Sequence, residues 1–175
     1  MKRAQEKGLF TYTLHNLTDW TVRNTRRVDD RPYGGGAGTI ITIEPLTDAL
    51  RDITREYPTK DGSMMPIYLM APTGNLLKQH DVMWNMQKIN DKWSAIVICG
   101  HYEGVDERIF ELFDVTSVSI WEYVLSSGEL AAMVFIDSMV RIIPGVITDV
   151  SHEEDSFSKK FEWKKEYPQY SRPEV

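Results

Sequence analysis

Three groups of residues have types and spacings that could carry chemistry. Cys99 and His101 are two positions apart and could form a thiol–imidazole pair, but a cysteine that closes an apolar stretch is more often an inert core residue. Asp137 and Arg141 are four apart, the spacing of a surface ion pair on a helix. Residues 153–155 form a short acidic run that a solvated tail would explain equally well. The residue types alone leave these alternatives open.

A fourth group lies in residues 29–38, which read DDRPYGGGAG. A phosphate-binding P-loop is excluded because no Gly-Lys-Ser/Thr follows the glycines. Glycines allow the backbone to come close to a ligand, and the neighbouring charges and Tyr33 could supply contacts. A merely flexible loop remains the other interpretation of this segment.

The composition restricts the class of protein. Cys99 is the only cysteine, so no disulfide can form within the chain, and the four histidines show no metal-ligand spacing. We therefore expect no metal site from the residues. No stretch reaches the roughly 18 apolar residues of a membrane span, and no apolar run follows the charged start. The sequence predicts a soluble, cytoplasmic protein of one globular domain.

The net charge of −6 is unevenly distributed. Residues 1–32 contain seven Lys/Arg against four Asp/Glu, which makes the opening +3 and the remainder −9. A polyanion would be drawn to the end that carries Arg23, Arg26, Arg27 and Arg31. A solvated arginine-rich loop explains the same composition without a ligand.

Hydrophobic periodicity predicts the elements in the first third of the chain. Residues 2–7 are typical of the last turns of a helix ended by Gly8, and residues 10–15 alternate as a half-buried strand would. A long loop follows over residues 16–38. Pro45 then opens a helix that the turn residues 58–63 close.

The remaining pattern predicts an α/β protein. Strands are expected over residues 67–70, 95–99 and 115–120, and the first two end in turns at 71–74 and 100–104 before a helical pattern. Such βα units build a mostly parallel sheet, in which ligands bind at the carboxyl ends of the strands. A last helix over 129–143 should bury an apolar side formed by Leu130, Met133, Val134 and Val140.

Six segments together carry a family resemblance. They are DDRPYGGGAG, ICGHYEGVDERI, YVLSSGELAAMVFID, RIIPGV, EDSF and YSRPEV. In this order they resemble the bacterial tRNA (guanine-N1)-methyltransferase family of the SPOUT class. The resemblance implies an α/β fold with flanking helices and a C-terminal trefoil knot, and a homodimer whose active sites form between subunits.

The resemblance also implies how the chain is divided. Residues 1–146 correspond to the knotted catalytic domain and residues 147–175 to an interdomain linker or tail. The chain is expected to be shorter than the family at both ends, without a preceding strand and helix and without the helical domain that grips tRNA.

Site residues follow from the matching motifs. The resemblance implies Asp155 as the general base and Arg141 as the cation that stabilises charge on the guanine oxygen. It implies contacts to S-adenosylmethionine from Tyr68, Leu69, Pro72, Gly100, Tyr102, Glu103, Ser119, Ile120, Tyr123, Leu125 and Gly128. It assigns tRNA contacts to the glycine-containing segment, through Arg27, Asp30, Arg31, Tyr33, Gly34 and Gly35.

The implied reaction is transfer of a methyl group from S-adenosylmethionine to N1 of the guanosine 3′ of the anticodon in tRNA. The resemblance adds magnesium in catalysis, which no residue pattern indicates. The cofactor loop departs from the family at Trp121 and Ser127, where the family has glycine, and at Ala131, where it has proline. Two alternatives therefore stay open: a knotted protein that binds cofactor or RNA without catalysis, and an inactive knotted core.

Overall fold

The fold is described from a computed structural model, for residues 1–92, 94–147 and 155–172. Its centre is a parallel three-stranded sheet in the order β4-β3-β5, formed by β3 (Ile67–Leu76), β4 (Ile96–Cys99) and β5 (Val115–Ser119). A separate antiparallel pair joins β1 (Asp29–Asp30) to β2 (Ile40–Ile41). The predicted α/β class with a parallel sheet is thus confirmed.

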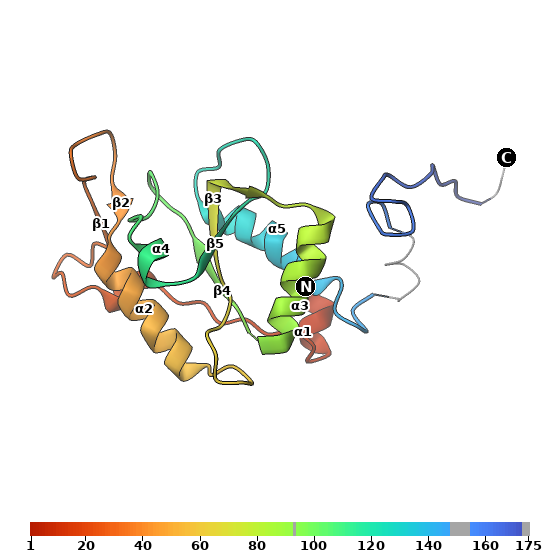
Figure 1. Ribbon diagram of the computed structural model, residues 1–175, viewed down its shortest axis with the longest axis horizontal. Helices are drawn as coiled ribbons and strands as arrows, with labels where there is room; N and C mark the ends of the chain where they lie inside the picture. The colour runs from red at the N-terminus through yellow and green to blue at the C-terminus, as the bar shows by residue number, and fades with distance from the viewer. Residues whose placement is uncertain (93, 148–154, 173–175) are drawn as a thin grey trace.

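Helices cover both faces of the sheet (Figure 1). On one face, α2 (Ile43–Glu56) and the short α4 (Ile109–Leu112) pack against Ile67 and Leu69. On the other face, α3 (Gln79–Lys92) and α5 (Gly128–Val140) pack against Tyr68 and Met70. Successive residues of a strand point to opposite faces, so the continuous apolar run of β3 supplies both cores.

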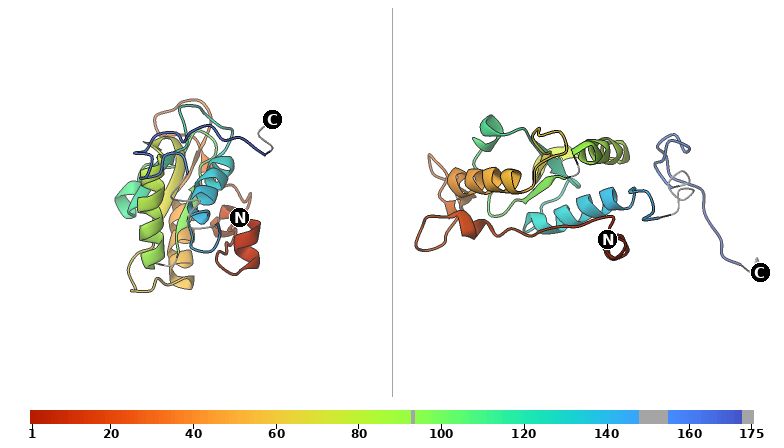
Figure 2. Two further views of the ribbon diagram at one scale, coloured as in Figure 1. Left: turned by 90° about the vertical axis from the view of Figure 1, so that its right-hand side faces the viewer. Right: turned by 90° about the horizontal axis from the view of Figure 1, so that it is seen from below.

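The chain ends lie outside this layered body. The first helix, α1 (Lys2–Glu6), buries Ala4 and is tied to the region after α5 by a hydrogen bond from Lys7 Nζ to the Gly145 carbonyl, 2.7 Å long. A 3-10 turn, η1 (Leu17–Trp20), contacts α2. Residues 155–172 contain no helix or strand and extend away from the sheet in the right-hand view of Figure 2. The domain boundary at residue 146 and the trefoil knot stay predictions.

The strand predicted over residues 10–15 is wrong. These residues form no strand, and Tyr12 and Leu14 are exposed. Alternation of apolar and polar residues makes a strand only where another strand offers hydrogen bonds. Here the segment instead contacts its surroundings through rings, including an edge contact between His15 and Tyr57 at 6.1 Å.

The first sheet strand does not end at residues 71–74 as predicted. β3 continues to Leu76, and its pairing with β5 is interrupted between Met70 and Asn75, where both residues face Val118. Gly74 lies inside this irregularity, and a Cβ there would be 2.5 Å from the Val118 nitrogen. The turn residues therefore create a bulge in a longer strand, since glycine and proline weaken regular pairing without always ending it.

The apolar side predicted for the last helix is also largely wrong. Leu130, Met133 and Val134 are 56%, 49% and 52% exposed, and only Val140 of the predicted set is buried. The face that packs on the sheet consists of Ala131, Ala132, Phe135 and Met139. Because α5 is apolar on nearly every side, periodicity could not decide which side faces the sheet.

Candidate functional site

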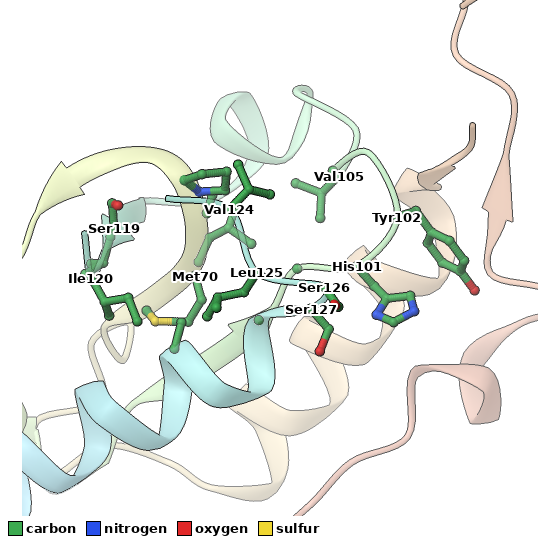
Figure 3. Close-up of a pocket in the computed structure, with 18 of the residues that line it drawn as sticks. Met70, His101, Tyr102, Val105, Ser119, Ile120, Val124, Leu125, Ser126 and Ser127 are labelled. Atoms are coloured by element: carbon green, nitrogen blue, oxygen red, sulfur yellow. The ribbon is translucent and has the colours of Figure 1, made fainter. Parts of the chain in front are cut away.

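A cavity of about 310 Å³ opens at the carboxyl ends of the strands. Its walls come from the interruption in β3, the turn after β4 (residues 100–105) and the loop between β5 and α5 (residues 120–127). Figure 3 shows Met70 and Leu125 in the middle of the lining residues, between Ser119 and Ile120 on one side and His101 on the other. This is the edge at which ligands bind in open α/β sheets.

The close approach of two chain segments shapes one end of the cavity. The N–H of Gly128 donates a hydrogen bond of 2.7 Å to the Gly100 carbonyl. A Cβ on Gly128 would lie 2.5 Å from the Gly100 nitrogen and 2.9 Å from the Cys99 Cα. Only glycine fits at this point, which brings the start of α5 directly against the end of β4.

Residues of the turn after β4 have a strained backbone. Tyr102 has φ +58°, a left-handed conformation that residues with a side chain rarely adopt, and Gly104 has φ +145°. In Figure 3 the Tyr102 ring points away from Met70 and Leu125. Such strain is commonly retained where a ligand site requires it.

Almost all of the predicted cofactor residues gather at this cavity. Its lining includes Leu69, Pro72, Gly100, Tyr102, Glu103, Ser119, Ile120, Tyr123, Leu125 and Gly128. Tyr68 is the exception, because its ring is buried in the core between β3 and α5 against Phe135, with ring centroids 4.9 Å apart. Burial raises the pKa of Tyr68 to about 12, so its phenol stays protonated in the core.

Several lining residues were not among the predicted cofactor contacts, although the turn at 100–104 and the loop with Trp121 and Ser127 were expected near the site. These are mainly Met70, His101, Val105, Ser126 and the two departures from the family, Trp121 and Ser127. The sequence signal that points to these residues is their position at or just after the ends of β3, β4 and β5. Neither Trp121 nor Ser127 has a positive φ, and Ser127 is extended at φ −163°. A side chain is therefore compatible with the backbone at both positions.

One carboxyl group lines the cavity and a second lies close to its lining residues. Glu103 belongs to its lining, and Glu129 follows in the first turn of α5. A hydrogen bond from Ser127 lowers the pKa of Glu129, with help from the backbone at the helix start. Cys99 has a raised pKa, first because it is buried and second because Glu129 is near. A thiol of this kind is a poor nucleophile, which agrees with the core interpretation of Cys99.

The predicted base and cation form an ion pair with each other. Arg141 Nη2 lies 2.6 Å from Asp155 Oδ2, and both side chains are partly exposed. Asp137, the alternative partner of Arg141, instead lies 3.6 Å from the N-terminal amino group. Arg141 follows α5 at the end opposite Gly128, so the pair is about 20 Å along the helix from the cavity.

The predicted tRNA segment is held in shape by its own charges. Arg27 Nη2 lies 2.9 Å from Asp29 Oδ2, and hydrogen bonds from Arg27 and Thr39 lower the pKa of Asp29. Arg23 pairs with Asp30 at 3.0 Å. Tyr33, Gly34 and Gly35 are exposed at the tip of the loop.

These pairs change the electrostatic prediction for the opening. Arg26 pairs with Asp19 at 2.8 Å, so Arg23, Arg26 and Arg27 all have an acidic partner. Within residues 1–92, 94–147 and 155–172, Arg31 is the arginine of this group for which no ion pair is found. The net charge of +3 already counts these aspartates, so the pairs do not lower it. They change which arginine is expected to meet a polyanion, because Arg23, Arg26 and Arg27 are each held by an aspartate.

The described residues show neither a metal site nor a membrane-spanning helix. Across the described ranges, no group of three or more His, Cys, Asp or Glu side chains is arranged to hold a metal ion. The acidic residues 153 and 154 lie outside these ranges. No helix in the described part of the chain has the length and apolar character needed to cross a bilayer.

Comparison with known proteins identifies similar sequences over the whole chain. A family model described as tRNA (guanine-1)-methyltransferase TrmD matches residues 1–175. The tRNA (guanine-N(1)-)-methyltransferase of Chloroflexus aggregans is 42% identical over 175 residues, which are 100% of this chain and 64% of that protein. The protein of the same name from Caldicellulosiruptor saccharolyticus is 42% identical over 99% of this chain and 65% of its own length. That from Clostridioides difficile is 40% identical, with 99% and 71% covered. The chain thus spans about two thirds of the length of these relatives.

Proposed function

The chain belongs to the tRNA (guanine-1)-methyltransferase family, and we propose that it transfers a methyl group from S-adenosylmethionine to N1 of the guanosine 3′ of the anticodon in tRNA. The observation that carries this proposal is the cavity at the carboxyl ends of the strands, where residues from three separate motifs meet. A tRNA substrate places the proposed reaction in the cytoplasm.

The cavity has the chemistry that the methyl donor needs. Leu69, Ile120 and Leu125 provide apolar walls for an adenine ring, and the backbone at Gly100 can approach a ligand closely. The donor carries a positive sulfonium, which the carboxylates of Glu103 and Glu129 attract. Bound there, S-adenosylmethionine would supply an activated methyl group.

The remaining chemistry falls to protein side chains. Guanine N1 holds a proton near neutral pH and becomes a nucleophile only when that proton leaves. We propose that the Asp155 carboxylate accepts the proton and that the Arg141 guanidinium stabilises the negative charge that develops on the guanine oxygen. The new bond joins N1 to the methyl carbon, the bond from carbon to sulfur breaks, and sulfur retains its electron pair. No covalent bond to the protein is needed.

Two subunits are required for these groups to meet. The Asp155–Arg141 pair lies about 20 Å along α5 from the cavity of its own chain. The exposed apolar face of α5, formed by Leu130, Met133 and Val134, offers a surface that a second copy could cover. We propose a homodimer in which each cavity receives Asp155 and Arg141 from the partner chain.

The implied magnesium has no site in the described residues, because their carboxylates form no suitable group. No step above involves a metal. A threaded trefoil would agree with the contact between Gly128 and Gly100, where the chain after β5 returns to the end of β4. The knot remains part of the proposal.

Methyl transfer to an RNA transcript tests the function directly. We expect labelled methyl from S-adenosylmethionine to appear on an anticodon stem-loop with guanosine at the target position. A transcript with adenosine at that position serves as the matched control and should stay unlabelled. Donor binding without transfer would favour the alternative of a binding protein, and absence of both would favour the inactive core.

A further inference from the structure

The glycine loop, residues 34–38, touches the wall of the cavity at one residue. Gly38 has φ +71° and lies directly against Glu103. A Cβ built on Gly38 would be 2.6 Å from both Cγ and Oε1 of Glu103 and 3.0 Å from its Cδ. No side chain fits at residue 38 while Glu103 keeps this position.

Backbone hydrogen bonds fix the chain after Gly38 to the same wall. The N–H of Glu103 donates to the Thr39 carbonyl at 3.0 Å, and the N–H of Ile41 donates to the Gly104 carbonyl at 2.9 Å. A third bond, 3.0 Å long, runs from the Asp106 N–H to the Ile41 carbonyl. The strained turn at Tyr102 is thus supported from outside by residues 39–41.

We propose that Gly38 is a positioning residue for Glu103, and that its missing side chain lets the Glu103 carboxylate stand at the cavity wall where the methyl donor binds. The role of Glu103 toward the donor rests on the proposed function. The role of Gly38 rests on the contact itself. At Gly38, the glycine loop that follows the segment proposed to hold RNA therefore meets the wall proposed to face the donor.

The expected response to a side chain at residue 38 is local. The atoms that a Cβ would strike belong to the outer part of a flexible Glu side chain, not to backbone. Glu103 can therefore rotate away, and the fold survives while the carboxylate is displaced. This distinguishes Gly38 from Gly74 and Gly128, whose added Cβ would strike backbone atoms.

Gly62 provides a matched control. It has the same φ of +71°, but a Cβ there would meet nothing within 4 Å. Gly38→Ala and Gly62→Ala should thus share the cost of a left-handed alanine and lower the melting temperature similarly. We expect calorimetry to show that S-adenosylmethionine binds Gly38→Ala at least about 10-fold more weakly than wild type, the effect of one displaced charged group. Gly62→Ala should bind like wild type.

A double mutant tests whether Glu103 mediates the effect. Glu103→Ala removes the side-chain atoms with which a Cβ at residue 38 would collide. In that background, adding Gly38→Ala should change donor affinity by no more than about 2-fold. Equal donor affinity in Gly38→Ala and Gly62→Ala would overturn the inference, as would a full loss from Gly38→Ala in the Glu103→Ala background. If the wild-type chain binds no donor at all, the proposed function fails first, and NMR then tests the contact by itself: the Glu103 side-chain signals should shift in Gly38→Ala and stay unchanged in Gly62→Ala.

Discussion

Asp155 and Arg141 pair with each other, although the proposed reaction has each of them contact the guanine. Arg141 Nη2 lies 2.6 Å from Asp155 Oδ2, so this carboxylate oxygen already accepts a hydrogen bond. In the proposed reaction the pair therefore opens or rotates before Asp155 accepts the proton of guanine N1. Because both side chains are partly exposed, the pair contributes little stability and can open readily.

Removing the carboxylate charge at residue 155 should stop the reaction without affecting donor binding. We expect Asp155→Asn to lower single-turnover methyl transfer by at least about 10²-fold, as for loss of a general base, while calorimetry shows unchanged donor affinity. Glu162→Gln is the control, since Glu162 is another exposed carboxylate of the same segment and pairs with Lys164 at 2.9 Å. An unaltered methyl-transfer rate in Asp155→Asn would contradict the assignment of Asp155 as the general base.

Arg31 is expected to contribute more to RNA binding than its arginine neighbours. An arginine that already pairs with aspartate gains little from a phosphate, whereas Arg31 has no ion pair among the described residues. Arg31→Ala should weaken binding of an anticodon stem-loop and reduce the salt slope by about 1. Arg26→Ala, which removes a pair with Asp19, should change the slope less. Equal slopes for the two variants, measured by salt titration, would contradict this.

At the scale of elements, the loop between β5 and α5 forms much of the wall of the cavity that is proposed to hold the donor. The Ser119 hydroxyl donates a hydrogen bond of 2.9 Å to the Trp121 carbonyl, which fixes the start of the loop. By the family resemblance, Trp121 and Ser127 stand where the family has glycine. Neither position has a left-handed backbone here, so neither requires a glycine. Trp121 can therefore affect a ligand through the space that its indole occupies at the cavity, and Ser127 also through its hydrogen bond to Glu129.

Shrinking both side chains should therefore enlarge the cavity. We predict that Trp121→Gly combined with Ser127→Gly tightens S-adenosylmethionine binding relative to the unmodified chain. The single variants serve as controls, with Trp121→Gly expected to account for most of the gain because the indole is the larger group. If calorimetry shows that the double variant binds no better, or worse, then the indole packs usefully against the ligand, as aromatic contacts can.

At the scale of the whole molecule, the exposed apolar face of α5 supports the proposed dimer. A helix that packs on a sheet with one face and leaves three large apolar residues exposed on another is typical of a subunit interface. The proposed chemistry also favours a dimer, because Asp155 lies far from the cavity of its own chain.

A charge placed on this face should separate the subunits. Light scattering of the wild-type chain at micromolar concentration should give a dimer, and Met133→Lys should give a monomer with methyl transfer reduced by about 10²-fold or more. Met83→Lys is the control, because Met83 on α3 is 48% exposed against 49% for Met133. A wild-type monomer with full activity would exclude the shared site.

Local patterns in the sequence predicted most of the elements and the edge of the sheet at which the cavity opens. The strands near residues 67, 96 and 115 and the helices that begin at Ile43 and Gly128 agree with the predictions to within a few residues at most ends. Hydrophobic runs and Gly/Pro turns act between near neighbours, so the sequence displays them directly. The motifs that resemble the family added the residues of the cavity, all but Tyr68 of which line it.

Only the tertiary structure decided which distant residues meet and which faces stay open. No local pattern places Gly38 against Glu103. Nor does one show that Arg141 pairs with Asp155 and not with Asp137, or that Arg26 pairs with Asp19. The strand expected over residues 10–15 failed because no partner strand lies beside it, and the apolar face of α5 was misassigned because the helix is apolar on almost every side. These outcomes depend on the order and packing of elements, which are contacts between segments remote in the chain.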